Sequence, residues 1–288
     1  MRAYAGLVLA LMATAALLGV RLAAAPTAAG YRHAMAAAPD GGLYEADPEL
    51  GLVLAAPDGG SKVRGRLPPG LPLALAADRQ QLLLGTDRGL FQSADGGAHW
   101  SASAVAQGRY PTVWVRSGLG LAGAWGGRLW RTLDAGATWE ALPTPAGDAE
   151  YQVVTVSNAV IYAATLRQVT RSFDGGRAWE ATRLPARVTA LEALGDQVLA
   201  ATWDGRVYSI DPTGGITARS RVGAGVWALA AGTAATTDGL AGLTGTPLDH
   251  REVTALVSAG SALYAGVARG PVYVSGDGGR AWRQVRQG

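Results

Sequence analysis

The sequence predicts an all-β fold made of repeated small sheets, and two observations lead to this fold class. The first is the pattern Ser/Thr-x-Asp-x-Gly-x-x-Trp, called the box below, whose four copies begin at Ser93, Thr132, Ser172 and Ser275. The aspartates of the first three copies are 39 and 40 residues apart, and a fixed period of this length indicates a repeat architecture. The second is the glycine content, 41 of 288 residues, spread among short strand-like runs. Together they predict a β-propeller, a closed ring of four-stranded blades.

The blades can be laid out along the chain. Five segments share one order: an inner first strand, a second strand, a third strand that runs into the box position, and a fourth strand that follows it. These segments cover residues 72–103, 113–142, 153–182, 188–219 and 253–285. Residues 226–243 fit one shortened blade, and residues 31–66 supply a first blade whose box is either Asp47-Pro48 or Asp58-Gly59-Gly60. The count is seven blades, with six as the alternative.

Each box predicts a tight turn that enters the next strand at a tryptophan. The aspartate can accept bonds from nearby backbone N–H groups, glycine tolerates positive φ, and the indole can bury a large apolar surface. Catalytic groups converge on one place, whereas these residues recur once per repeat, so we interpret them as scaffold rather than as catalysts or metal ligands. The structural set is Asp95, Trp100, Asp134, Trp139, Asp174, Trp179, Asp277 and Trp282.

The four boxes resemble the Asp-box, or BNR, repeat of β-propellers. This repeat occurs in sialidases, in sortilin-like receptors and in the photosystem II stability/assembly factor family. Degenerate copies, in the segments around Asp211 and Asp47, keep the aromatic strand and the aspartate but lack the tryptophan. In repeat type and size the chain is most similar to the compact propellers related to the assembly factor. The resemblance implies a propeller that serves as a binding or assembly module.

The first thirty residues predict export. Residues 3–20 form an uncharged apolar run between Arg2 and Arg21, as in a secretory leader helix. A run of 18 residues is also near the minimum that spans a bilayer, so the segment is either a cleaved signal peptide or a membrane anchor. We therefore expect residues 1–30 to be leader or anchor plus a short linker, and residues 31–288 to be the propeller. The protein is expected to be secreted or tethered, with the propeller on the extracytoplasmic side.

Composition argues against several classes of function. The chain has no cysteine, so disulfides, thiolate catalysis and Cys-ligated zinc are excluded. His33, His99 and His250 are isolated in sequence, and we expect neither a metal nor a cofactor. The formal net charge of +3 falls to +1 without Arg2 and Arg21, so the basic balance does not indicate nucleic-acid binding.

A binding surface is expected on the face opposite the boxes. The box turn joins the third and fourth strands, so the turns between second and third strands, and the crossovers to the next blade, share the other face around the central channel. Arginine and tryptophan are enriched at recognition hot spots. The candidates in these turns are Arg88, Trp125, Arg167, Trp203 and Arg269. They suit a protein or carbohydrate partner of a monomeric propeller. In the alternative reading, the tryptophans pack under the neighbouring blade and the arginines are solvated turn residues.

A sialidase-like or other glycoside hydrolase is the alternative function. The resemblance to sialidases implies an arginine triad that binds a carboxylate, a Tyr–Glu nucleophile pair and an Asp that acts as the acid. It also implies a Phe/Tyr-Arg-Ile-Pro motif. Tyr31-Arg32-His33-Ala34 keeps only the first two letters of that motif, and the chain contains seven glutamates. Glu140 and Glu180 follow box tryptophans and are therefore expected on outer strands. No catalytic residue is assigned, and the sequence favours a non-catalytic binding or assembly scaffold.

Overall fold

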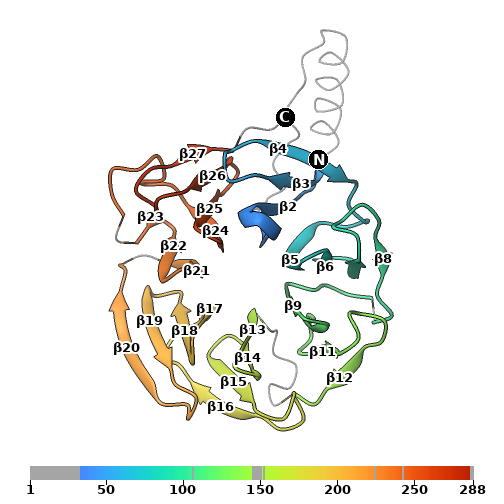
Figure 1. The fold of residues 1–288 in the computed structure, drawn as a ribbon. Coiled ribbons are helices and arrows are strands. Elements are labelled where there is room, and N and C mark those ends of the chain that lie inside the picture. Colours follow the sequence, from blue (N-terminus) through green and yellow to red (C-terminus); the bar gives the residue numbers. More distant parts are fainter. Residues whose placement is uncertain are drawn as a thin grey trace, which may run out of the picture. The chain divides into compact units, whose positions relative to one another are not determined.

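The computed structural model describes residues 33–105, 107–144, 151, 153–223, 225–241 and 243–285. These residues form seven antiparallel sheets, each made of strands consecutive in the chain. The sheets follow one another around a ring (Figure 1), so the prediction of a seven-bladed, all-β propeller is confirmed. The predicted leader, residues 1–30, lies outside the described residues. In the described part of the chain, no helix has the length and apolar character needed to cross a bilayer.

The strands of the first four blades are bounded as follows. Blade 1 contains β1 (Ala34–Ala37), β2 (Leu43–Asp47), β3 (Gly51–Ala55) and β4 (Ser61–Gly65), with a 3-10 turn, η1 (Pro39–Gly41), after β1. Blade 2 contains β5 (Pro72–Asp78), β6 (Gln81–Thr86), β7 (Leu90–Ser93) and β8 (Ser101–Ala102). Blade 3 contains β9 (Thr112–Arg116), β10 (Leu119–Gly123), β11 (Leu129–Thr132) and β12 (Glu140–Leu142). Blade 4 contains β13 (Val153–Ser157), β14 (Val160–Ala164), β15 (Gln168–Ser172) and β16 (Glu180–Arg183).

The remaining three blades complete the ring. Blade 5 contains β17 (Val188–Leu194), β18 (Gln197–Thr202), β19 (Arg206–Ile210) and β20 (Ile216–Arg221). Blade 6 contains β21 (Val226–Ala230), β22 (Thr233–Thr236) and β23 (Gly239–Leu240). Blade 7 contains β24 (Val253–Ala259), β25 (Ala262–Val267), β26 (Val272–Ser275) and β27 (Arg283–Gln284). Blade 6 is the shortened one, as the sequence predicts, and Leu248 from the segment after β23 is fully buried against it.

The hydrophobic core consists of separate clusters between blades rather than one central mass. Seven clusters are found among the described residues, and each joins residues of two neighbouring blades. Second strands are buried on both faces; all five residues of β14 are buried, for example. The outermost strands are solvated, and every residue of β20 is exposed. Burial also raises the pKa of Tyr110, Tyr151 and Tyr264 to about 12. The ring is therefore held together one blade boundary at a time.

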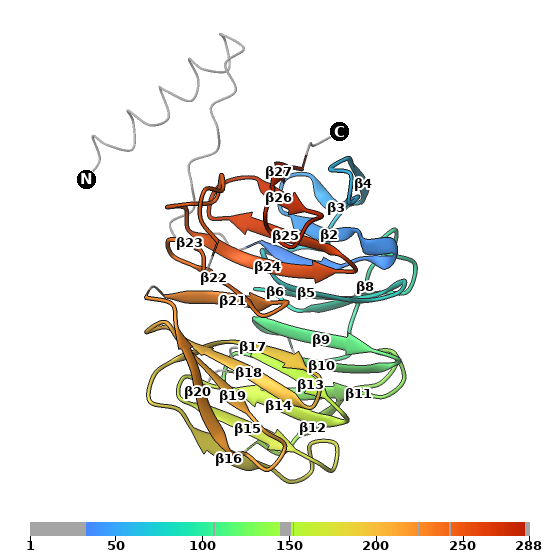
Figure 2. The ribbon, with the colours of Figure 1, turned by 60° about the vertical axis from the view of Figure 1, so that its left-hand side comes forward.

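The last and first blades meet at the boundary that closes the ring. Among the described residues, blade 7 contains only C-terminal strands and blade 1 only N-terminal ones; the two blades are neighbours in Figures 1 and 2, and β1 contacts β24. The Tyr264 hydroxyl donates to the Gly41 carbonyl at 3.0 Å, and the Arg283 guanidinium donates to the carbonyl of Pro57. An apolar cluster that includes Met35 and Val274 fills the space between the two sheets.

The structure settles the register of blade 1, which the sequence left open. Asp58-Gly59-Gly60 occupies the turn between the third and fourth strands, the position of the boxes. Asp47 instead ends the second strand, and its Oδ1 accepts the N–H groups of Glu49 and Leu50 at 2.8 Å. The segment around Asp47 is therefore not a degenerate box, and that interpretation is corrected. The mistake arises because a hairpin turn of either kind uses the same aspartate chemistry.

Candidate functional site

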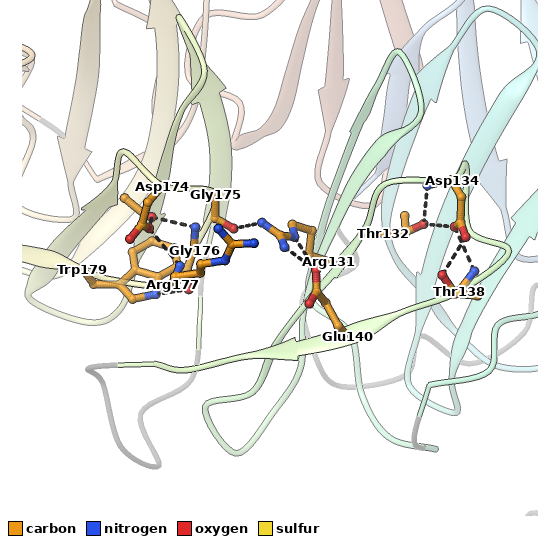
Figure 3. A network of polar contacts seen from close by, with 11 residues as sticks. Arg131, Thr132, Asp134, Thr138, Glu140, Asp174, Gly175, Gly176, Arg177 and Trp179 are labelled. Carbon is orange, nitrogen blue, oxygen red and sulfur yellow. Dashed lines mark hydrogen bonds and ion pairs between the residues drawn. The ribbon is translucent and has the colours of Figure 1, made fainter.

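The four boxes form turns of one geometry, each between the third and fourth strands. In the second copy, Thr132 Oγ1 donates to Asp134 Oδ1 at 2.7 Å and accepts the Gly136 N–H at 2.8 Å. The same carboxylate accepts the Thr138 N–H at 2.8 Å and the Thr138 hydroxyl at 2.6 Å (Figure 3). These bonds, led by the one from the Thr138 side chain, lower the pKa of Asp134 to about 2. The carboxylate organises its own turn.

The other three boxes repeat this arrangement. Their serine hydroxyls donate to the aspartates at 2.8 Å in each copy. Backbone bonds from His99, Ala178 and Ala281 are the largest cause of the lowered pKa values of Asp95, Asp174 and Asp277, respectively. Each aspartate is engaged within its own turn, and no three His, Cys, Asp or Glu side chains gather as a metal-binding group anywhere in the described residues.

The box tryptophans are half-buried between blades. Trp100, Trp139, Trp179 and Trp282 each pack against a cluster shared with the preceding blade. In the last two copies the indole N–H closes back on the box glycine: Trp179 Nε1 donates to Gly176 O at 3.0 Å, and Trp282 Nε1 donates to Gly279 O at 2.8 Å. The box is thus both a turn and a contact between blades.

The face opposite the boxes, called the crossover face below, carries the five candidate residues. Each candidate lies in a turn between second and third strands, on blades 2, 3, 4, 5 and 7. Four of these turns are tied to the crossover that leads into their own blade; the N–H groups of Trp125 and Trp203, for example, donate at 2.8 Å to the carbonyls of Arg109 and Arg187. The turn of Arg167 is tied to the crossover that leaves its blade, because the Arg167 carbonyl accepts the Leu184 N–H at 2.9 Å. The turns are therefore fixed by backbone bonds.

The structure leaves these candidates exposed and separate from one another. The exposed fraction is 57% for Trp125 and 41% for Trp203, and Arg88, Arg167 and Arg269 are also exposed. The two indoles have other neighbours: the Arg109 guanidinium lies 4.7 Å from the centre of the Trp125 ring, and Trp203 meets Trp227 edge to face at 4.6 Å. No hydrogen bond, ion pair or ring contact joins any two of the five candidates within the described residues.

The crossover face carries exposed arginines and exposed acids. Arg88, Arg167 and Arg269 form no ion pair within the part of the chain that the structure describes. Two acids on the same face are paired: Asp204 contacts Arg206 at 3.1 Å, and Asp238 contacts His250 at 3.1 Å. Glu49, Asp87 and Glu252 are exposed on this face too, each in a turn or crossover that holds no more than one of the three arginines. Since the three arginines remain available, this face suits an acidic partner.

The central channel opens beneath this face. A cavity of about 250 Å³ is lined by the crossover ends of all seven first strands, β1, β5, β9, β13, β17, β21 and β24. The lining is mostly aliphatic, with three threonines and Trp227. His33 is the one titratable side chain among the lining residues that the structure describes, and no Asp, Glu, Arg or Lys is found there.

His33 is engaged in the channel wall, a role that the sequence analysis missed. Its Nδ1 lies 2.5 Å from Glu45 Oε1, and its Nε2 donates to the Val267 carbonyl at 2.9 Å, across the boundary between blades 1 and 7. Burial lowers the pKa of His33, but the hydrogen bond and charge of Glu45, with the Val267 carbonyl and the charge of Asp47, outweigh burial and raise it above 6.5. A histidine outside any ligand motif gave no signal of this pairing.

Trp227 lies inside β21, the first strand of blade 6. It lines the channel and contacts Trp203, so it connects the channel with the crossover face. Trp227 directly follows Val226, which is buried at the start of this inner strand. Because side chains alternate between the two faces of a strand, a tryptophan next to the first apolar residue of a strand-like run is the sequence signal for this position.

The class of protein is defined by this architecture: a seven-bladed propeller with an exposed Arg- and Trp-bearing face around an apolar channel. No protein-family model matches the chain, and no curated protein is significantly similar to it.

Solved structures share the fold at low sequence identity. The computationally designed Ika8 protein is similar with a TM-score of 0.63 and 15% identity, over 89% of this chain and 87% of that one. YCF48 bound to a D1 peptide has a TM-score of 0.57 and 18% identity, over 72% and 79%. YCF48 from Cyanidioschyzon merolae has a TM-score of 0.58 and 15% identity, over 73% of this chain and 83% of that one. An ancestral GH74 enzyme has a TM-score of 0.56 and 14% identity. The match covers 85% of this chain but only 36% of that enzyme.

Proposed function

We propose that the protein is a non-catalytic binding module that captures a segment of a protein partner on its crossover face. The observation that carries the proposal is the set of exposed arginines and tryptophans held on backbone-fixed turns around the channel mouth. A turn whose backbone is already fixed loses little backbone entropy on binding, and Arg and Trp are enriched among hot-spot residues.

Two resemblances support a peptide-binding role. A solved neighbour of the same fold, YCF48, is seen with a D1 peptide bound. The box turns, with a Ser/Thr hydroxyl, a self-capping aspartate and a half-buried tryptophan in each copy, also fit the Asp-box repeat of the assembly-factor propellers. Both resemblances concern the scaffold, and the choice of partner rests on the charge of the crossover face.

The glycoside-hydrolase alternative has less to support it. Glycosidases place two carboxyl groups about 5–10 Å apart across the scissile bond. Among the described residues, no aspartate or glutamate lines the channel, and both Glu140 and Glu180 are paired on outer strands with Arg131 and Arg171. The GH74 neighbour shares the fold, but the match covers only 36% of the length of that enzyme. A carbohydrate stacked on the exposed indoles would therefore be a bound partner rather than a substrate.

Selection from a random dodecapeptide library displayed on phage tests the proposal. We expect acidic peptides to be selected by the purified full chain. The triple variant R88E, R167E and R269E should lose at least about tenfold in affinity for them, a change of about 1.4 kcal/mol or more. The matched control is the triple variant R79E, R177E and R280E, which reverses three exposed arginines on the box face. Failure to select any peptide, or equal losses in the two triple variants, would overturn the proposed function.

We also propose that the module is exported, with residues 3–20 as a cleaved leader or a membrane anchor. The mass of the mature protein distinguishes these two forms. Cleavage in the following small-residue tract should yield a secreted chain of reduced mass. An intact chain extracted only by detergent would indicate the anchor. An intact chain found wholly in the cytosolic fraction would contradict export.

A further inference from the structure

We propose that the channel mouth is an anchor pocket that takes one uncharged, apolar side chain of a bound acidic peptide. This inference rests on the proposed function and adds to it the side chain that the partner inserts. It is carried by the strand irregularities that shape the mouth, by a mostly aliphatic lining whose titratable side chain, His33, is already paired with Glu45, and by the exposed arginines around it.

The mouth is shaped by a repeated β-bulge. In four of the first strands the pairing with the second strand shifts by one residue near the crossover face. The residues skipped by the shifts are Leu73, Thr189, Trp227 and Thr254, and all four line the channel. A bulge leaves one residue unpaired and changes the direction of its side chain. The same bulge in blades 2, 5, 6 and 7 thus places four unpaired residues at the channel mouth.

The threonine and histidine side chains of the lining are hydrogen-bonded to the wall. Thr112 Oγ1 accepts the Val154 N–H at 3.1 Å, and Thr189 Oγ1 donates to Ala201 O at 3.4 Å. His33 directs both ring nitrogens to Glu45 and Val267. A charged group entering the channel would lose water without finding a partner of opposite charge, which costs several kcal/mol. The pocket therefore selects an uncharged, apolar group.

Trp227 and Trp203 form the lip of the pocket. Trp227 belongs to the channel lining and Trp203 is 41% exposed, and their rings meet edge to face at 4.6 Å with planes 69° apart. The glycine that precedes blade 6 accommodates this arrangement, because a Cβ at Gly225 would lie 3.3 Å from the Trp203 ring. A side chain passing into the channel would contact aromatic surface first.

Charge complementarity identifies the occupant as a peptide segment. The exposed arginines Arg88, Arg167 and Arg269 lie outside the pocket, on turns of three different blades, and form no ion pair among the described residues. An extended segment with acidic residues on either side of one large apolar residue satisfies both the rim and the pocket. A free aromatic or aliphatic small molecule would satisfy only the pocket.

The test fills the pocket and uses the selected dodecapeptides as probes. We expect those peptides to share one large apolar residue, and its replacement by serine should weaken binding by about tenfold or more. The variant T189F, which fills the mouth beside Trp227, should weaken binding of the parent peptide to the same degree. It should leave binding of the serine peptide unchanged, because that peptide no longer uses the pocket. The control T189V keeps the shape of the side chain and should bind within about twofold of wild type.

Each outcome bears on one proposal. If the serine replacement has no effect, or if T189F binds the parent peptide as tightly as wild type does, the anchor pocket is wrong while the crossover face stands. If the parent peptide loses affinity for T189F and the serine peptide loses as much, the variant acts on the rim and the pocket is again wrong. Should T189F lose its cooperative melting transition, T254F at the equivalent bulge of blade 7 is measured in its place and judged by the same outcomes.

Discussion

The guanidinium of Arg131 on blade 3 donates to the backbone carbonyl of Gly175, which belongs to the box turn of blade 4 (Figure 3). Its Nε–H is held at 2.8 Å by Glu140 on the neighbouring strand of its own blade. One period later, Arg171 bonds Glu180 at 2.6 Å and lies against Gly214 in the corresponding turn of blade 5. The third strand of blade 3 is thus hydrogen-bonded to the box turn of blade 4, and the third strand of blade 4 packs against the corresponding turn of blade 5.

Replacing Arg131 tests this tie between blades. We expect R131L to lower the free energy of unfolding by about 1–3 kcal/mol, because the Gly175 carbonyl loses a charged donor. Glu140 is exposed enough to be hydrated after the change. Urea denaturation measures the loss, and R183L, which removes an exposed arginine from β16, is the control and should be nearly neutral. Equal midpoints for R131L and wild type would show that the contact adds nothing to stability.

A second prediction concerns the box tryptophans. W179A should destabilise the fold by about 3 kcal/mol, at the low end for a large-to-small change, since the indole is only half-buried. W125A removes an indole that is 57% exposed and should stay within about 0.5 kcal/mol of wild type. Thermal melting of both variants measures this difference in stability. If the two melting curves coincide, Trp179 is not an anchor between blades.

The box glycine is expected to be needed both for its backbone conformation and for space. Gly176 has φ of 98°, and a Cβ there would lie 2.5 Å from Leu142 Cδ1 of the preceding blade. Gly126 has φ of 87° with nothing within 4 Å. Alanine is strained at positive φ, so both alanine variants should lower the free energy of unfolding by about 1–2 kcal/mol. G176A should lower it further, because its new Cβ overpacks the contact with Leu142.

A double variant isolates the steric part of that cost. L142A removes the side chain that the new Cβ would meet, so G176A and L142A together should destabilise less than the sum of their separate effects. Chemical denaturation of the three variants gives the coupling. Strict additivity would mean that the glycine is required for its φ alone.

The His33–Glu45 contact predicts how stability depends on pH. Because the folded-state pKa of His33 is raised above 6.5, the stability it contributes is fully present below pH 6.5. That contribution is lost as the pH rises through the folded-state value. The urea midpoint of wild type should therefore fall from pH 6 toward pH 9 more steeply than that of H33Q, which cannot titrate. Parallel pH profiles would rule out a charged His33 at the boundary between the blades.

The fold could be read from the sequence because its signals are local. Asp, Gly and Trp in each box act within a single turn, so four turns and the blade spacing were fixed without knowledge of distant contacts. The channel could not be read in this way. Leu73, Thr189 and Thr254 look like any strand residues, and only their bulges place them at the mouth. The pairing of His33 with Val267 joins opposite ends of the chain and left no mark in local sequence.

In the part of the chain that the structure describes, every blade consists of strands consecutive in sequence, and blades 7 and 1 exchange no strand. New termini could therefore be introduced at another blade boundary, with the old ends linked, without dismantling any sheet. Duplication or loss of a single coding unit would likewise change the circumference of the wheel while leaving each remaining sheet intact.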